Sequence, residues 1–155
     1  MIDRERMYLQ ELKDFQTTER IMKNIFCQYG LNVELIQNPL FSHIDTKLMV
    51  NKKHRYNVEI KERTQDMEKY KTLPLKVKKY INILKNTEKN IKPLVIYLVN
   101  NKEYFIFNLR QIDLNKCEFD NWFINKVEFD KNQIKDEIPT LFIPINQAIY
   151  KGKIN

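Results

Sequence analysis

The stretch YNVEIKER, residues 56–63, alternates polar and apolar side chains as a half-buried β-strand does. Val58 and Ile60 are then expected to enter a core, while Glu59 and Lys61 share the opposite face. Glu59 and Lys61 have two interpretations. They are either an ordinary solvated pair on an amphipathic strand, or a carboxylate and an amine held close together to do chemistry. The flanking segments help to choose between the two.

The residues before this strand predict two further strands. LNVELIQ at 31–37 and HIDTKLMV at 43–50 both have strand-like patterns, with turn residues between them. The polar connector NKKHR joins 43–50 to 56–62, which predicts an antiparallel hairpin. Asp45 and Glu59 are expected to lie on the same, non-core face of that hairpin.

A long helix is predicted over residues 3–29, with Gly30 at the position of a left-handed C-terminal cap. Glu19 interrupts its apolar stripe near the centre, where an unpaired carboxylate would be costly. Glu19 is therefore either a metal ligand or a core-edge residue paired with a Lys or Arg, and both interpretations stay open. The apolar side chains expected to face the core are Tyr8, Leu12, Phe15, Met22, Phe26 and Tyr29.

A parallel crossover is predicted after the opening stretch. Pro74 suits the first turn of a second helix that runs to about position 88, with Ile81 among its inward residues. PLVIYLV at 93–99 is a continuous apolar run, typical of a strand buried on both faces, and a further strand is expected at 103–109. A strand, a helix and a buried strand in this order imply a parallel β-α-β unit.

The C-terminal segment, 110–155, is predicted to form a sheet edge and its cover. We expect a loop around 119–123, a short strand at 126–129, an irregular strand at 137–145 because of its two prolines, and a short terminal helix.

Composition limits the function classes. A chain of 155 residues is expected to form one domain, and its net charge of +7 favours polyanionic partners such as nucleic acid. Two glycines are too few for glycine-rich phosphate loops, and two cysteines with two histidines do not make a structural zinc site. No membrane partner is expected, and the start MIDRER has no apolar signal segment, so we expect a cytoplasmic location.

The order helix, three strands, helix, strand, with HID at 43–45 and EIK at 59–61, resembles the PD-(D/E)XK nuclease superfamily. The resemblance covers a core of about 3–109. It implies an α/β fold with a restriction-endonuclease-like αβββαβ core, a mixed central sheet flanked by helices, and extra C-terminal strands in 110–155.

The resemblance also implies a metal site. Phosphodiester hydrolysis needs charge stabilisation and an activated water, and Mg²⁺, for which Mn²⁺ may substitute, supplies both through oxygen ligands. Asp45 and Glu59 would be the carboxylate ligands, and Lys61 would hold or help to deprotonate the attacking water. By the resemblance, the backbone carbonyl of Ile60 and the first-helix Glu19 complete the set.

Basic residues around this set are candidate nucleic-acid contacts. The N-terminus of the second helix should lie near Lys61, and helix N-termini attract phosphates. Lys76 in the expected first turn is the first choice there, followed by Lys79. The other candidates are Lys47, Lys53 and Arg55 on the hairpin.

The acid-x-Lys pattern occurs twice more, as Glu11-Leu12-Lys13 and Asp45-Thr46-Lys47. The first is discounted because i and i+2 side chains diverge on a helix. The second stays open, with Glu34 as its upstream acid. We prefer Asp45, Glu59 and Lys61 because a helix follows 59–61 in the expected order.

These observations predict a metal-dependent deoxyribonuclease that hydrolyses phosphodiester bonds in duplex or branched DNA. Resolvases, nickases and restriction-like enzymes of phages and mobile elements are the branches that the resemblance implies, and resolvase or restriction activity usually needs a homodimer. The alternatives are a catalytically inactive nucleic-acid-binding module on the same fold, and an interaction protein in which 59–61 is simply an amphipathic strand.

Overall fold

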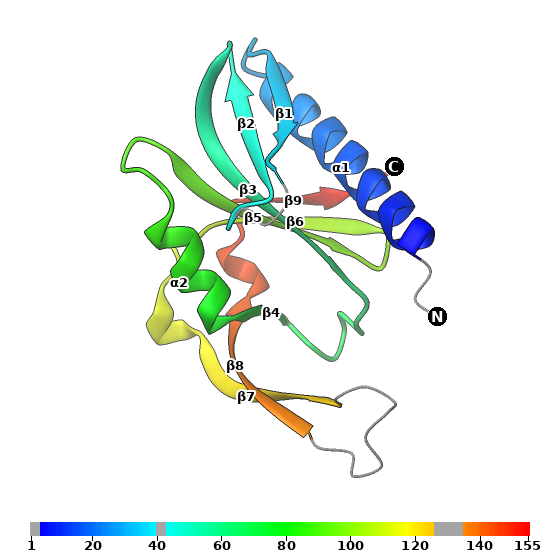
Figure 1. Cartoon of the computed structure of the whole chain (residues 1–155), viewed down its shortest axis with the longest axis vertical. Coiled ribbons are helices and arrows are strands. Elements are labelled where there is room, and N and C mark those ends of the chain that lie inside the picture. The colour runs from blue at the N-terminus through cyan, green and yellow to red at the C-terminus, as the bar shows by residue number, and fades with distance from the viewer. Residues whose placement is uncertain (1–3, 40–42, 126–134) are drawn as a thin grey trace.

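The computed structural model describes residues 4–39, 43–125 and 135–155. It shows a mixed α/β protein with two α-helices, a large mixed sheet and a small antiparallel sheet (Figure 1). The elements are α1 (Arg4–Cys27), β1 (Val33–Gln37), β2 (Thr46–Val50), β3 (Lys53–Arg63), β4 (Thr72–Lys76), α2 (Val77–Lys85), β5 (Lys92–Val99), β6 (Glu103–Asn108), β7 (Glu118–Asn125), β8 (Lys135–Pro144) and β9 (Tyr150–Lys153), with short 3₁₀ helices at Leu114–Lys116 and Ile145–Gln147.

The large sheet has the strand order β1-β2-β3-β5-β6-β9. β2 and β3 form the predicted antiparallel hairpin, with Thr46 opposite Val58. β3 and β5 are parallel, with Glu59 opposite Val95, so the predicted crossover is also confirmed. The expectation that 93–99 is buried on both faces holds, because every residue of β5 after its first is buried.

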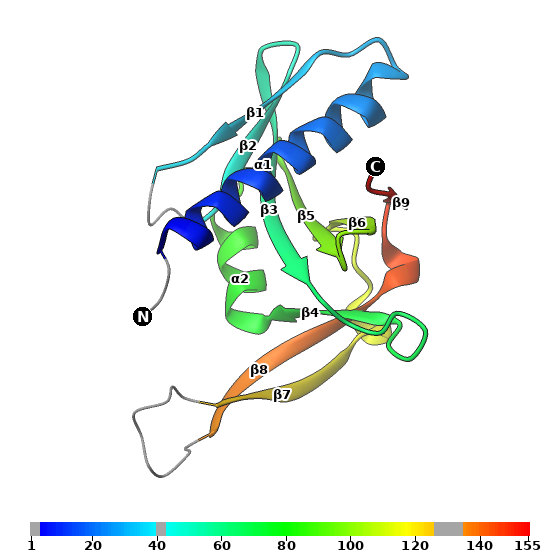
Figure 2. The same ribbon diagram turned by 90° about the vertical axis from the view of Figure 1, so that its right-hand side faces the viewer.

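The two helices cover opposite faces of the large sheet (Figure 2). One core packs α1 against side chains such as Val58 and Ile96, which point to the same face. The other core packs α2 and β8 against Val95 and Tyr97, which point to the opposite face. Because side chains alternate along a strand, Glu59 shares the α2 face with its neighbour Val95.

The first helix ends as predicted, but it packs over less of its length. Gly30 has a φ of +67°, and the Leu31 amide donates to the carbonyl of Phe26, as in a left-handed cap. The buried part extends from Thr18 to Phe26. The prediction that Tyr8, Leu12 and Tyr29 face the core was wrong, since all three are exposed.

The second helix begins at Val77 rather than at Pro74 and ends at Lys85 rather than near position 88. Pro74 belongs instead to β4, which within the described residues pairs only with β8. An edge strand tolerates proline because one side of its backbone needs no ladder partner. Ile81, predicted to point inward, is 53% exposed, and Ile83 is the buried residue of this helix.

The C-terminal segment contributes to both sheets. β7, β8 and β4 form the small sheet, so the loop expected at 119–123 is a strand. β9 pairs with β6 at the edge of the large sheet, so the terminal helix was also wrong. The short strand expected at 126–129 lies outside the described residues.

Within the described part of the chain, neither helix combines the length and the apolar character that a membrane crossing requires.

Candidate active site

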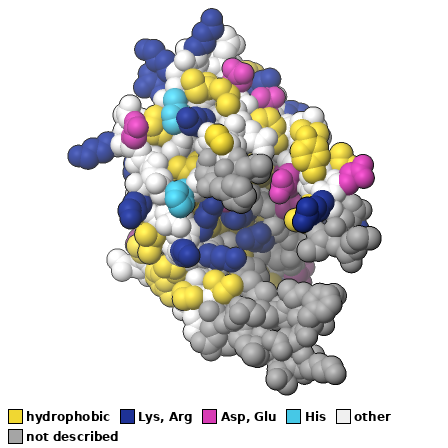
Figure 3. Space-filling model, in the orientation of Figure 1, with side chains coloured by type: hydrophobic (Ala, Val, Ile, Leu, Met, Phe, Trp, Pro, Cys, Tyr) yellow, Lys and Arg dark blue, Asp and Glu magenta, His cyan; other side chains and the backbone are white. Residues whose placement is uncertain are grey.

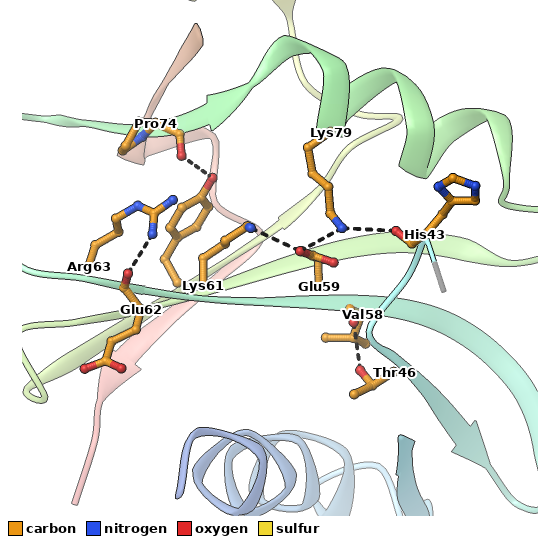
Figure 4. Close-up of polar contacts among 10 residues, drawn as sticks. His43, Thr46, Val58, Glu59, Lys61, Glu62, Arg63, Pro74 and Lys79 are labelled. Carbon is orange, nitrogen blue, oxygen red and sulfur yellow. Dashed lines mark hydrogen bonds and ion pairs between the residues drawn. The ribbon is translucent and has the colours of Figure 1, made fainter. Parts of the chain in front are cut away.

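Glu59 is a buried carboxylate between β3 and α2. Its exposed fraction is 2%, although β3 also contains charged residues that are more exposed. Two ammonium groups approach the same oxygen: Lys61 Nζ and Lys79 Nζ each lie 3.1 Å from Glu59 Oε1 (Figure 4). Lys61 comes from the same strand and Lys79 from the first turn of α2. The solvated-pair interpretation of Glu59 and Lys61 is therefore wrong, because the carboxylate is enclosed.

Lys79 also connects the site to the segment before β2. Its Nζ donates to the backbone carbonyl of His43 at 3.1 Å (Figure 4). Lys76, the first choice from the sequence, is exposed and immediately precedes α2. Lys79, two residues after the helix start, is thus the one of the two candidates that reaches Glu59.

Asp45 lies beside Glu59 on the neighbouring chain segment. It immediately precedes Thr46, whose Cα partner is Val58, so the antiparallel register places Asp45 opposite Glu59. Two bonds fix this position: Thr46 Oγ1 donates to the carbonyl of Val58 at 2.7 Å, and the Asn38 amide donates to the carbonyl of Asp45 at 2.9 Å.

The electrostatics of the site are those of a carboxylate pair with added cations. Burial is the main cause that raises the pKa of Glu59, and the negative charge of Asp45 raises it further. Lys61 and Lys79 act in the opposite direction and lower that pKa. The two lysines offset only part of the cost of burying the charge.

The donor set fits a hard divalent cation. Glu59 Oε2 is buried, and among the residues that the structure describes no hydrogen-bond partner reaches it. A buried, unpartnered carboxylate oxygen beside a second carboxylate is a set of ligands that Mg²⁺ accepts, with water completing the coordination. No group of three or more His, Cys, Asp or Glu side chains in the described ranges forms a metal cluster by itself. Asp45 and Glu59 would therefore hold the ion together with water, and the carbonyl of Ile60 stays a prediction from the resemblance.

Glu19 lies elsewhere, on the α1 side of the sheet. Its Oε2 accepts from the backbone amide of Leu35 at 3.3 Å, and its Oε1 lies 3.6 Å from Lys23 Nζ. Leu35 belongs to the core under α1, whereas Glu59 points to the α2 face. The geometry favours the paired, core-edge interpretation of Glu19, because both of its oxygens have protein partners.

Two other acidic residues of α1 line a pocket together with Asp45: Glu11, which the sequence analysis discounted as part of an acid-x-Lys pattern, and Asp14, which it did not consider. The pocket has a volume of about 270 Å³ and is also lined by the β3 residue Ile60. The pKa of Asp14 is raised to about 6, mainly by burial and next by a hydrogen bond with Glu62. The i, i+3 spacing of Glu11 and Asp14 was the available signal, since it places both on one helix face.

The alternative set of Glu34, Asp45 and Lys47 does not converge. Glu34 is opposite Met49, four residues along β2 from Asp45, which is about 13 Å at the usual rise of a strand. Lys47 is exposed and opposite Asn57.

The remaining basic candidates lie at the surface. Lys53 and Arg55 are exposed near the start of β3, six and four residues before Glu59. On the face seen in Figure 1, a band of Lys and Arg side chains crosses the surface (Figure 3). A positively charged surface of this kind attracts a phosphate backbone without reading its sequence.

Neither a protein-family model nor a curated protein sequence matches this chain.

Proposed function

We propose that the chain is a metal-dependent DNA endonuclease with a restriction-endonuclease-like core. The fold supports this through the order of α1, three antiparallel strands β1-β2-β3, α2 and the parallel strand β5. β4 is an addition to the expected order and lies in the small sheet.

The observation that carries the proposal is the environment of Glu59. Glu59 is 2% exposed, has one unpartnered oxygen and lies opposite Asp45. Burying a carboxylate in this way costs free energy, and a residue that served only to pack the fold would not need the charge. Such a cost is typical of functional sites, where burial and like charges are arranged to bind a cation or to move a proton. Lys61, two residues on, adds the amine that the chemistry uses.

Each residue then has a role. Asp45 and Glu59 would hold Mg²⁺, which would supply positive charge near the phosphoryl oxygens and lower the pKa of a water. Lys61, whose ammonium touches the Glu59 carboxylate, orients the attacking water and stabilises the negative charge that develops on phosphorus oxygens. Lys79 is a positioning residue, since it joins Glu59 to the segment that carries Asp45.

A cleavage assay tests the proposal. Supercoiled plasmid, single-stranded DNA and branched junctions are incubated with Mg²⁺, Mn²⁺ or EDTA, and the parent is compared with Glu59→Gln and Lys61→Met. We expect metal-dependent cleavage that falls by about 10³-fold in each variant. Glu68→Gln and Lys69→Met are matched controls, because both residues are exposed and outside the site.

Two results would contradict the proposal: no cleavage with any metal, or variants that cut as fast as the parent. DNA affinity that is retained without cleavage, and that weakens steeply with salt, would then identify an inactive nucleic-acid-binding module.

A further inference from the structure

A second polar pocket lies beside the Glu59 site, between the β2-β3 hairpin and the loop that follows α2. Its volume is about 410 Å³, within the range of pockets that hold small ligands. Lys47 and Asn57, which face each other across the hairpin, belong to its lining, as does Glu88 from the loop. The pocket is thus formed by segments that are far apart in the sequence, the β2-β3 hairpin and the loop after α2.

This pocket and the candidate active site are both lined by the β2-β3 hairpin. Asn57 precedes Glu59 by two residues and Lys47 follows Asp45 by two, so each lies on the same face of its strand as an active-site carboxylate. His43, which lines the pocket, accepts through its carbonyl from the lysine that contacts Glu59. A ligand in the pocket would therefore lie next to a phosphate bound at Glu59.

The pocket contains an ordered set of polar groups. Asn57 is 5% exposed; its Oδ1 lies 2.8 Å from His54 Nε2, and its Nδ2 donates to Thr87 Oγ1 at 3.1 Å. Two further amides are held by local bonds: Asn38 Nδ2 donates to a backbone carbonyl at 2.9 Å, and Asn86 Nδ2 does so at 2.7 Å. Their orientation is therefore defined before any ligand binds.

The chemistry of the lining matches a nucleotide. Amide and imidazole groups offer both donors and acceptors, which is what the edge of a nucleobase requires. Ile44 and Ile91, both buried, provide apolar contact, and the Lys47 ammonium provides a partner for a phosphate. The histidines do not form a metal site with the pocket carboxylate, since no such cluster occurs among the described side chains.

We propose that this pocket binds one unpaired nucleotide of the DNA substrate, adjacent to the phosphodiester that is cut. The inference rests on the proposed function and narrows its substrate class to single-stranded or branched DNA. A base inside a continuous duplex has its pairing edge occupied and its faces stacked, so it cannot enter a pocket without being extruded. An unpaired base at a fork or flap enters without that cost.

Binding is measured separately from cleavage. The chain has two histidines, and both line this pocket, so the two histidine ring signals in a ¹H–¹³C NMR spectrum report on it directly. Figure 3 shows both histidines on the same face as the basic band. With EDTA present to prevent cleavage, the protein is titrated with a deoxynucleoside monophosphate, with single-stranded and duplex oligonucleotides, and with inorganic phosphate.

We expect both histidine signals to shift with the monophosphate and with single-stranded DNA, and to shift less with duplex or inorganic phosphate. Asn86→Trp places a bulky side chain in the pocket from an exposed position. It should weaken binding of the monophosphate at least about fivefold, an effect similar in size to the loss of one hydrogen bond. Lys47→Glu should do the same through its charge. Asn90→Trp and Lys89→Glu are the matched controls, because both residues are exposed and do not line the pocket.

The same variants are then assayed for cleavage. Asn86→Trp and Lys47→Glu should lower the ratio of fork to duplex cleavage, while the controls keep it. Unchanged histidine signals, or equal shifts with duplex or inorganic phosphate, would overturn the pocket assignment even if Glu59→Gln abolishes cleavage. Absence of metal-dependent cleavage in the parent would instead overturn the proposed function, on which the inference rests.

Discussion

Lys79 Nζ lies 3.1 Å from Glu59 Oε1, so the helix α2 is joined to the middle of β3 by an ion pair that is largely enclosed. The same ammonium donates to the carbonyl of His43, two residues before Asp45. One side chain therefore joins Glu59 to the chain segment that carries Asp45, the second carboxylate that would hold a metal ion.

Lys79→Met should lower both stability and metal affinity. It leaves Glu59 with one cation and frees the carbonyl of His43, at a cost of about 1–3 kcal/mol in the free energy of unfolding. Thermal unfolding measures the first effect. The second is a rise in the Mg²⁺ concentration that gives half-maximal cleavage. Lys78→Met is the control, because Lys78 is exposed on the same helix, and equal effects of the two variants would contradict the positioning role.

Glu19→Gln should leave cleavage unchanged. Glutamine keeps an oxygen that can accept from the Leu35 amide and loses only the partly exposed pair with Lys23, so the free energy of unfolding should fall by less than about 1 kcal/mol. Cleavage rate and thermal unfolding are measured together. A loss of cleavage at unchanged stability would restore Glu19 as a metal ligand.

Asp14 should make the protein less stable as the pH rises. The pKa of Asp14 is raised from 3.8 to about 6 in the folded state, so the folded form holds a proton that the unfolded form has released in this interval. The contribution is fully present below pH 3.8 and is lost as the pH rises through about 6. Asp14→Asn should remove this dependence and stabilise the protein at pH 7 by about 1 kcal/mol, since partial exposure screens the repulsion.

Urea unfolding at a series of pH values measures the effect. Glu62→Gln should flatten the same interval, because Glu62 is the neighbour that contributes both a hydrogen bond and a charge. Glu68→Gln, at an exposed position, is the control, and an unchanged slope in Asp14→Asn would show that another group causes the dependence.

Arg110→Lys should destabilise the loop after α2. The guanidinium donates to four backbone carbonyls, and a lysine ammonium cannot reach them all in the same geometry. We expect a loss of about 1–2 kcal/mol and faster amide hydrogen exchange in the loop. Lys89→Arg is the control, and unchanged exchange would contradict this role of Arg110. The four acceptors are the carbonyls of Thr87, Glu88, Lys89 and Ile91.

Local patterns predicted the parts of the fold that depend on local contacts. Alternation along 56–63 and the apolar run at 93–99 indicated β3 and β5, and Gly30 indicated the end of α1. Pro74 was misplaced because its strand is defined by pairing with β8, about 70 residues later, and propensity carries no information on such a partner.

The candidate site divides in the same way. The two-residue period of a strand predicts that Glu59 and Lys61 share a face, and the register of the hairpin predicts that Asp45 lies opposite Glu59. The contact of Lys79 with Glu59 could not be predicted, because it depends on where the helix starts and how it packs on the sheet. Glu19 was predicted to lie near the centre of the buried stripe of α1. The helix packs along only part of its length, so the centre of that stripe lies at Thr18 and Met22 instead.

The direct junction between β4 and α2 has a mechanical consequence. Lys76 ends a strand of the small sheet and Val77 begins the helix that carries Lys79, with no linker residue between them. A movement of the small sheet would therefore be transmitted through β4 to α2, and it would change the position of Lys79 relative to Glu59.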